Sequence, residues 1–173
     1  LQLYVNQPQQ LSQTTNISTS NYSGYNIRCK GENSGWIELS VSGGYGPYSY
    51  LWNNSSTNSD LDSLCAGNYM LTITDSNGCT LTDSAIIDEP IAIVISLDSL
   101  ANVSVYAGND GALFTSSYGQ TNSFTYEWSG PNLFSASIPN ISNIPAGTYC
   151  LTATDSTLCS TTSCFIITQP PSL

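Results

Sequence analysis

The stretch SLCAGNYMLTITDS (Ser63–Ser76) recurs later in the chain as NIPAGTYCLTATDS (Asn143–Ser156). The same correspondence continues upstream, where Trp52 matches Trp128, but the offset there is shorter by four positions. The difference is an insertion after Trp128, in the segment that begins Ser-Gly-Pro-Asn. Self-similarity at a fixed period is the mark of a repeat architecture. The sequence therefore predicts a tandem duplication.

The segment at the start of the chain looks like the end of a repeat. Leu3–Pro8 resembles Ala85–Pro90 and Phe165–Pro170, the two segments that close the repeats. We therefore expect two complete repeats cut from a longer array; the alternative is a two-domain protein with an additional N-terminal strand. The predicted segments are 1–8 (last strand of a preceding repeat), 9–89 (repeat 1), 90–170 (repeat 2) and 171–173 (start of a following repeat).

Alternating apolar and polar residues recur in short runs, separated by Gly, Asn, Asp and Pro, which is typical of β-strands. The predicted strands are 11–19, 36–41, 48–52, 68–74 and 81–88 in repeat 1, and 91–97, 112–117, 124–128, 148–154 and 161–168 in repeat 2. Repeats of roughly 80 residues with about seven short strands are typical of immunoglobulin-like sandwiches. Leu64–Tyr69 and Ile144–Tyr149 have the form of a tyrosine corner, in which the tyrosine hydroxyl bonds back to the preceding turn. The predicted fold class is all-β, with tandem immunoglobulin-like (fibronectin-III-like) β-sandwich repeats.

The charge balance excludes several classes of function. The chain has 12 acidic residues, 2 basic residues and no histidine, for a formal net charge of -10. Nucleic acids and anionic lipids both require a basic surface. Without histidine there is no Ser-His-Asp or Cys-His catalytic set and no histidine-ligated metal. No apolar stretch approaches the roughly 20 residues of a membrane span. We therefore expect no nucleic-acid partner, no direct membrane insertion and no enzyme.

Three motifs distinguish the first repeat: CKGENSG (Cys29–Gly35), SGGYGPYSYLW (Ser42–Trp52) and TDSNGC (Thr74–Cys79). Together they resemble the SprB repeat family, which occurs in tandem in large surface adhesins of gliding bacteria. The resemblance implies a structural or adhesive segment of a long extracellular, cell-surface protein or filament, exported by type IX secretion. It implies adhesion or gliding motility as the setting and no catalytic residues. The expected partners are neighbouring repeats of the same chain or filament, with surface polysaccharide as a further candidate. The second repeat departs from the pattern, with Val105, Ser123 and Leu158 in place of Cys29, Pro47 and Gly78.

Six cysteines in a chain without histidine favour disulfides in an oxidising compartment over a zinc site. The resemblance to SprB repeats implies a Cys29–Cys79 disulfide. In repeat 2, Cys150 and Cys164 lie on the last two predicted strands, on either side of a turn near residue 157, which favours a Cys150–Cys164 disulfide. Cys65 and Cys159 stay open: they are free buried thiols, or they bond between repeats or chains. A disulfide-stapled array is the predicted mechanical role.

Other candidate sites compete with simpler interpretations. Asp75, Asp110 and Asp155 are of the residue type that binds calcium, but Asp also caps turns through its own side chain, so no cofactor is predicted. Loop aromatics stack on sugars in lectins, and Tyr45 and Tyr118 (with Tyr22, Tyr25 and Phe134) lie in predicted loops. A glycan-binding sandwich is therefore the alternative function. Asp-Ser pairs followed by small or aliphatic residues resemble an O-glycosylation acceptor used by such bacteria. The candidate glycoprotein sites are Ser63, Ser84, Ser99 and Ser156.

Overall fold

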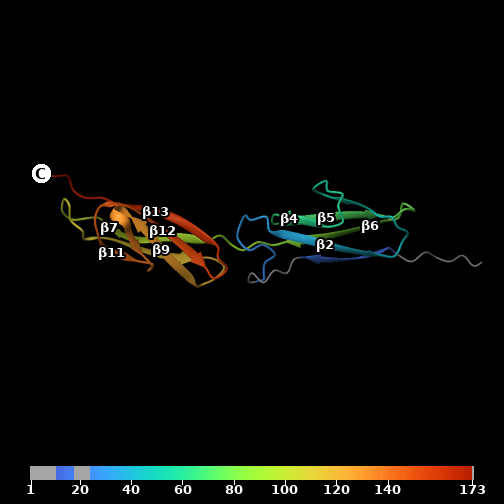
Figure 1. Ribbon diagram of the computed structural model, residues 1–173, viewed down its shortest axis with the longest axis horizontal. Coiled ribbons are helices and arrows are strands. Elements are labelled where there is room, and N and C mark those ends of the chain that lie inside the picture. The colour runs from blue at the N-terminus through green and yellow to red at the C-terminus, as the bar shows by residue number, and fades with distance from the viewer. Residues whose placement is uncertain (1–10, 18–23, 173) are drawn as a thin grey trace, which may run out of the picture. The chain divides into compact units, whose positions relative to one another are not determined.

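The computed structural model describes residues 11–17 and 24–172. The chain divides into two compact units, Leu1–Pro90 (unit 1) and Ile91–Leu173 (unit 2). Both units are built from antiparallel strands (Figure 1). The segment 1–8, predicted to belong to a preceding repeat, lies outside the described residues, and so does Tyr22.

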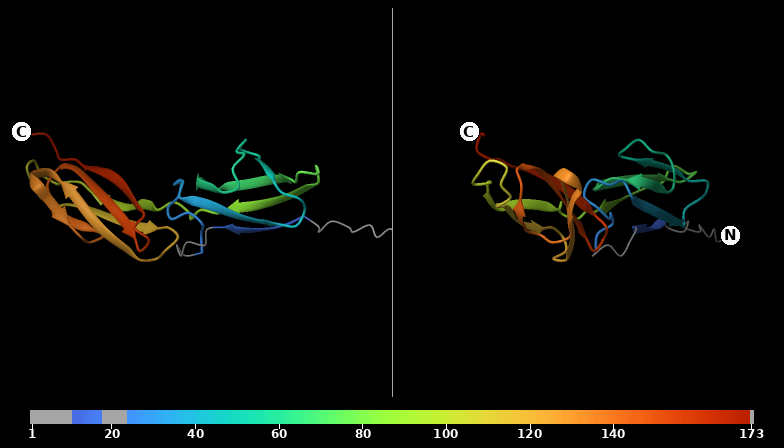
Figure 2. Two further views of the ribbon diagram at one scale, coloured as in Figure 1. Left: turned by 45° about the vertical axis from the view of Figure 1, so that its right-hand side comes forward. Right: turned by 60° about the vertical axis from the view of Figure 1, so that its left-hand side comes forward.

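Unit 1 packs two three-stranded sheets face to face, ordered β1-β2-β4 and β3-β5-β6. Figure 2 shows these two layers, with β1 and β2 in blue and β5 and β6 in green. Alternate residues of β5 are buried, as the period of a half-buried strand requires. The strands are β1 (Ser12–Ile17), β2 (Gly35–Ser42), β3 (Ser49–Trp52), β4 (Leu61–Leu64), β5 (Gly67–Thr74) and β6 (Thr80–Ile87).

Unit 2 repeats this order, with the sheets β11-β8-β7 and β10-β9-β12-β13. One sheet of each unit pairs the first, second and fourth strands of the common pattern, and the other sheet pairs the third, fifth and sixth. This division matches the A-B-E and C-F-G strands of immunoglobulin domains. Both units are therefore immunoglobulin-like β-sandwiches, which confirms the predicted fold class. The strands are β7 (Val94–Ala101), β8 (Gly111–Tyr118), β9 (Phe124–Gly130), β10 (Phe134–Ala136), β11 (Ile141–Ile144), β12 (Gly147–Asp155) and β13 (Ser160–Ile167).

The insertion after Trp128 forms a short hairpin arm of unit 2. It consists of the 3₁₀ turn Pro131–Leu133 and strand β10, which pairs antiparallel with β9. Phe134 on this arm packs edge-on against Tyr149, with ring centroids 5.3 Å apart. The inserted segment therefore extends the second sheet of unit 2 without changing the rest of its strand order.

A tryptophan anchors the core of each unit. Trp52 and Trp128 are each 1 % exposed. Their indole Nε1–H groups donate to the carbonyls of Asn58 (2.9 Å) and Ile138 (3.0 Å), respectively. Buried indole N–H groups need such a partner, because an unpaired donor in a core costs stability. The same contact in both units fixes the segment that follows each tryptophan.

The tyrosine corner predicted in each repeat is confirmed. Tyr69 and Tyr149 donate from their hydroxyls to the carbonyls of Cys65 and Pro145, each at 3.0 Å. Tyr149 is fully buried, and this desolvation raises its pKa above the usual value for tyrosine. The hydroxyl groups of both tyrosines therefore make contacts that stabilise the fold.

Glycine is required where two strands cross closely in each core. A Cβ atom at Gly111 would lie 2.8 Å from the carbonyl oxygen of Ile144 and 2.9 Å from Cγ2 of Ile167. Gly35, its counterpart in unit 1, would meet the equivalent atoms of Leu64 and Ile87 at 2.9 and 2.8 Å. Contacts this short do not occur for a real side chain in a packed interior without a shift of the backbone.

Candidate functional site

The Cys150–Cys164 disulfide joins β12 to β13, as the sequence predicts. The two cysteines lie directly opposite each other in the antiparallel register, with Cα atoms 4.0 Å apart. The neighbouring Leu151 is buried. Since successive side chains of a strand point to opposite faces, the disulfide lies on the outer face of its sheet. It staples the last hairpin of unit 2 rather than forming part of the core.

The predicted Cys29–Cys79 disulfide is wrong, because Cys79 is an exposed free thiol. Cys79 lies in the turn that begins β6, whereas the loop of Cys29 packs at the other end of that strand. There the backbone N–H groups of Asn26 and Ile27 both donate to the carbonyl of Asp88, at 3.1 Å. An eight-residue strand spans roughly 25 Å, and a disulfide requires Cα atoms within about 7 Å. The two cysteines are therefore too far apart to bond within unit 1.

Cys65 is also an exposed free thiol. Of the alternatives left open by the sequence, a buried thiol is thus excluded for this residue. Pro145 holds the equivalent position in unit 2, so repeat symmetry carries no information about a partner for Cys65.

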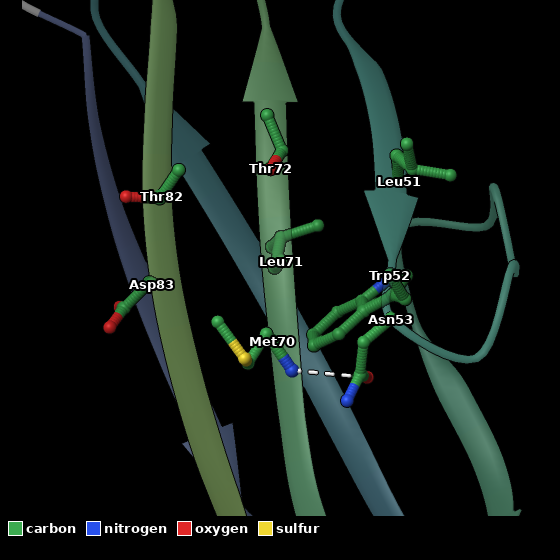
Figure 3. A pocket seen from close by; sticks show the side chains of 8 residues that line it. All are labelled: Leu51, Trp52, Asn53, Met70, Leu71, Thr72, Thr82 and Asp83. Carbon is green, nitrogen blue, oxygen red and sulfur yellow. Dashed lines mark hydrogen bonds between the residues drawn. The ribbon is translucent and has the colours of Figure 1, made fainter.

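The outer face of the β3-β5-β6 sheet holds a shallow hollow of about 260 Å³ in unit 1 (Figure 3). The side chain of Asn53 closes one side of the hollow, where its Oδ1 accepts the backbone N–H of Met70 at 3.2 Å. Leu51 and Met70 are more than half exposed at its rim. Among the described residues that line this hollow, Asp83 is the one ionisable side chain, whereas a hydrolytic site uses a paired acid and base. Its lining is Leu51, Trp52, Asn53, Met70, Leu71, Thr72, Thr82 and Asp83.

Asp75 closes the turn between β5 and β6 with its carboxylate. Oδ1 accepts the backbone N–H groups of Asn77 (2.9 Å) and Cys79 (2.8 Å), and Oδ2 accepts that of Tyr45 (3.1 Å). Desolvation would raise the pKa of Asp75, but the N–H donors of Cys79, Tyr45 and Asn77 outweigh it, so the pKa lies below its usual value. The carboxylate of Asp75 therefore stabilises the turn between β5 and β6.

Asp155 plays the same part in the turn between β12 and β13. Its Oδ1 accepts the backbone N–H groups of Thr157 (2.8 Å) and Cys159 (3.0 Å). Asp75 and Asp155 are 5 % and 6 % exposed. Within the described residues, no cluster of three or more His, Cys, Asp or Glu side chains could hold a metal ion. The backbone N–H contacts of Asp75 and Asp155 are those that the turn-capping interpretation predicts.

Glu89 and Asp110 also use their carboxylates for contacts within the fold. Glu89 forms an ion pair with Lys30 and accepts the backbone N–H of Gly31 at 2.7 Å. The hydrogen bond from Lys30, followed by that from Gly31, holds the pKa of Glu89 below its usual value. Asp110 accepts the backbone N–H of Ser104 at 2.9 Å, and its pKa is lowered mainly by Ser104. The Lys30–Glu89 pair was not predicted, and only the opposite charges of the two residues signal it in the sequence.

The candidate sugar contacts lie apart along the chain and in different units. Tyr45 is 54 % exposed in the loop between β2 and β3, and Tyr118 is 53 % exposed at the end of β8. Phe134 and Tyr25 are only partly exposed. Each described unit thus offers one of the two proposed aromatic contacts, where a stacking platform for a sugar usually combines several groups.

The four candidate glycosylation sites are all on the surface. The side chains of Ser63, Ser84, Ser99 and Ser156 are exposed. Exposure is a requirement for modification, and it is shared by many other serines of this chain, so the assignment stays a prediction.

No helix among the described residues has the length and apolar character needed to cross a lipid bilayer.

Comparison with solved structures finds several multidomain chains. Three N-terminal domains of the outer capsid protein Hoc of bacteriophage RB49 match with a TM-score of 0.44 at 13 % identity, over 93 % of this chain and 59 % of theirs. The eight N-terminal immunoglobulin domains of Down syndrome cell adhesion molecule match with a TM-score of 0.40 at 11 % identity, over 93 % and 25 %. Extracellular domains 3–5 of Drosophila OTK match with a TM-score of 0.38 at 13 % identity, over 79 % and 56 %. This chain thus spans about six tenths or less of these matched chains, and the fold assignment rests on the strand order above.

No curated protein matches this sequence. A family profile, however, matches residues 25–57, and its description is the SprB repeat. The matched segment contains two of the three motifs that carry the resemblance, Cys29–Gly35 and Ser42–Trp52. Residues 25–57 of unit 1 are therefore similar to the SprB repeat, which agrees with the resemblance that the motifs carry.

Proposed function

We propose that this chain is a structural and adhesive repeat segment of a long extracellular surface protein or filament, in which disulfide-stapled sandwiches are linked in series. The observation that carries the proposal is the duplicated immunoglobulin-like unit, whose first copy matches the SprB repeat model over residues 25–57. Repeat proteins of this kind gain reach and binding surface by adding units rather than by building an active site. The cell surface is the corresponding location.

The roles of the ionisable residues support a structural function. Asp75 and Asp155 cap turns, and Glu89 pairs with Lys30. Asp60 and Asp62 lie two residues apart and could resemble a catalytic carboxylate pair, but Asp60 accepts the backbone N–H of Leu39 at 2.8 Å. These carboxylates hold loops and strands together, so the proposal assigns no catalysis to them.

Surface labelling of intact cells that produce the protein tests this function. An antibody raised against this 173-residue chain is expected to label unpermeabilised cells, and a protease added outside the cells is expected to remove the signal. The control is an antibody against a cytoplasmic protein, which must label only permeabilised cells. Labelling of this chain that depends on permeabilisation would refute the proposal.

The secretion route, the biological setting and the glycosylation expected from the sequence belong to the same proposal. We infer export by type IX secretion, a part in gliding motility, and O-glycosylation at one or more of the exposed serines. Glycosylation would increase the mass of the peptides that contain Ser63 or Ser99, and replacement of the modified serine by alanine would abolish that increase. Unmodified peptide masses in the native protein would refute the glycosylation.

Glycan binding is the second candidate function, and the exposure of Tyr45 and Tyr118 supports it. Each exposed ring would stack on a sugar face, with surface polysaccharide as the partner. Titration with surface polysaccharide is expected to show weak binding that is lost in Tyr45→Ala or Tyr118→Ala. Tyr106, which is 57 % exposed, provides the matched control, since Tyr106→Ala removes an exposed ring outside the proposed contacts. Equal binding by all these variants would reject this function.

A further inference from the structure

Cys79 presents a free thiol from a rigid turn. Asp75 fixes the backbone of Cys79 from two sides, since its Oδ1 accepts the N–H of Cys79 at 2.8 Å and its own N–H donates to the carbonyl of Cys79 at 2.9 Å. Asp75 is the charged side chain of this turn, and a hydrogen bond from the Cys79 side chain is among the contacts that lower its pKa. The other two side chains, Ser76 and Asn77, are exposed and uncharged. A second protein surface can therefore approach the thiol without meeting an unpaired charge of the turn.

The equivalent turn of unit 2 carries a cysteine that does form a disulfide. Asp155 holds Cys159 by the same pair of contacts, at 3.0 Å from the N–H of Cys159 and 2.9 Å to its carbonyl. Cys159 is disulfide-bonded and only 8 % exposed, whereas Cys79 is free and exposed. The two turns thus share the same backbone contacts, but only Cys159 forms a disulfide. The bonded Cys159 shows that this position of the fold accommodates a disulfide.

The other cysteines of unit 1 lie too far from Cys79 to bond with it. Cys65 lies two residues before Gly67, the first residue of β5, which pairs with Ile87 at the far end of β6. Cys79 precedes Thr80 at the near end of that strand. Seven residues of antiparallel strand separate the two ends by roughly 24 Å, as they also separate Cys79 from the loop of Cys29. Any disulfide partner of Cys79 must therefore come from outside unit 1.

We propose that Cys79 is a linking cysteine, which forms a disulfide with a cysteine of another immunoglobulin-like unit. The inference rests on the proposed array function and names the covalent contact that such an array would use. The partner cysteine has two sources, which are a preceding unit of the same polypeptide and a second copy of this chain.

Thiol–disulfide exchange with a small disulfide such as oxidised glutathione supplies the oxidation. The Cys79 thiolate attacks one sulfur of oxidised glutathione, and the other sulfur leaves as a glutathione thiolate. The partner thiolate then attacks Cys79 in the mixed disulfide and releases the second glutathione. Two protein thiols are oxidised to one disulfide, while one oxidised glutathione is reduced to two thiols, and the two protons of the protein thiols end on glutathione.

The test uses the native polypeptide and the chain described here, produced alone, in parallel. Both are incubated with a mixture of oxidised and reduced glutathione, alkylated, and digested without reduction for peptide mass mapping. If the partner is a second copy, the chain produced alone gives a species of twice its 18.5 kDa mass, linked through Cys79. If the partner is a preceding unit, the native polypeptide gives a Cys79 peptide linked to a cysteine peptide that is absent from this sequence. Either result supports the proposal.

Cys65→Ser is the matched control, because Cys65 is the other exposed free thiol. Cys79→Ser is expected to abolish the linked species and Cys65→Ser to leave it unchanged, while hydrogen exchange shows both variants folded. A Cys79 peptide recovered only in alkylated form from both preparations, or a link through Cys65 alone, would overturn the proposal.

The mass of the native polypeptide separates this inference from the function on which it rests. A native polypeptide that is large but holds alkylated Cys79 would overturn the linking role alone. A native mass of 18.5 kDa with and without reductant, which is the mass of this sequence by itself, would overturn the proposed array.

Discussion

Replacing Cys150 and Cys164 together by serine is expected to destabilise unit 2 alone. The disulfide closes a segment of 14-residue separation, and the chain-entropy relation gives about 3 kcal/mol for a loop of this size. Cys164 is exposed and Cys150 only partly buried, so loss of packing adds little to that figure. For a domain of roughly 60–100 residues, each kcal/mol lowers the unfolding midpoint by roughly 4–8 °C. The predicted decrease for unit 2 is therefore about 12–24 °C.

Hydrogen exchange measured by mass spectrometry along a temperature series reads the two units separately in one molecule. Peptides from β12 and β13 should lose protection at a lower temperature in the double variant, while peptides from β5 and β6 keep theirs. Unit 1 is the internal control, because its equivalent positions are Met70 and Ser84. A decrease in the unit 2 midpoint of less than about 4 °C, corresponding to less than roughly 1 kcal/mol, would refute the assignment of stability to this bond. An equal decrease in unit 1 would refute its location.

Three other substitutions test the packing and the electrostatics. Gly111→Ala should destabilise unit 2 by about 1–3 kcal/mol in urea unfolding, because the new Cβ clashes with the core. Gly67→Ala is the control, since the atom nearest to its new Cβ lies 3.8 Å away. The control should cost less than half as much stability. Asp75 has a lowered pKa, so its stabilisation is present above its unfolded pKa of about 4 and is lost as the pH falls through the folded pKa. Asp75→Asn should therefore flatten the acid dependence of unit 1 stability below about pH 4. An acid profile equal to that of the unsubstituted chain would contradict the turn contacts. Tyr149→Phe removes the bond to a buried corner and should cost about 1 kcal/mol in the same urea assay, and an unchanged midpoint would show that the corner bond contributes nothing.

The long strands could be predicted from sequence because they follow a simple period. Three strands were not predicted: β10, which belongs to the insertion, and β4 and β11, which do not follow this period. In β4, Leu61 and Leu64 are buried with two exposed residues between them. Ser63 has a φ of 53° and Asn143, its counterpart in β11, a φ of 58°. These left-handed residues shift the register, so that the apolar spacing is three and alternation is lost.

The two predicted disulfides differ in the same way, because one depends on local sequence positions and the other on contacts distant in the sequence. Cys150 and Cys164 face each other across one hairpin, so strand positions alone are enough to pair them. The pairing of Cys29 with Cys79 was carried over from the family resemblance, and it required knowledge of which end of the sandwich each loop occupies. That information lies in backbone contacts such as the one from Ile27 to Asp88, which involve no distinctive side chain. The capping by Asp75 and Asp155 could be anticipated because aspartate in a tight turn commonly accepts nearby backbone N–H groups.

The mass of the native polypeptide, measured with and without reductant, tests the central claim most directly. This sequence by itself corresponds to 18.5 kDa. The array function predicts a reduced mass many times larger, with the units joined in one polypeptide, or an assembly of that size that reductant dissolves into chains of this single mass. A native mass equal to that of this sequence alone, under both conditions, would contradict the account, because a lone pair of sandwiches cannot serve as a segment of a surface array.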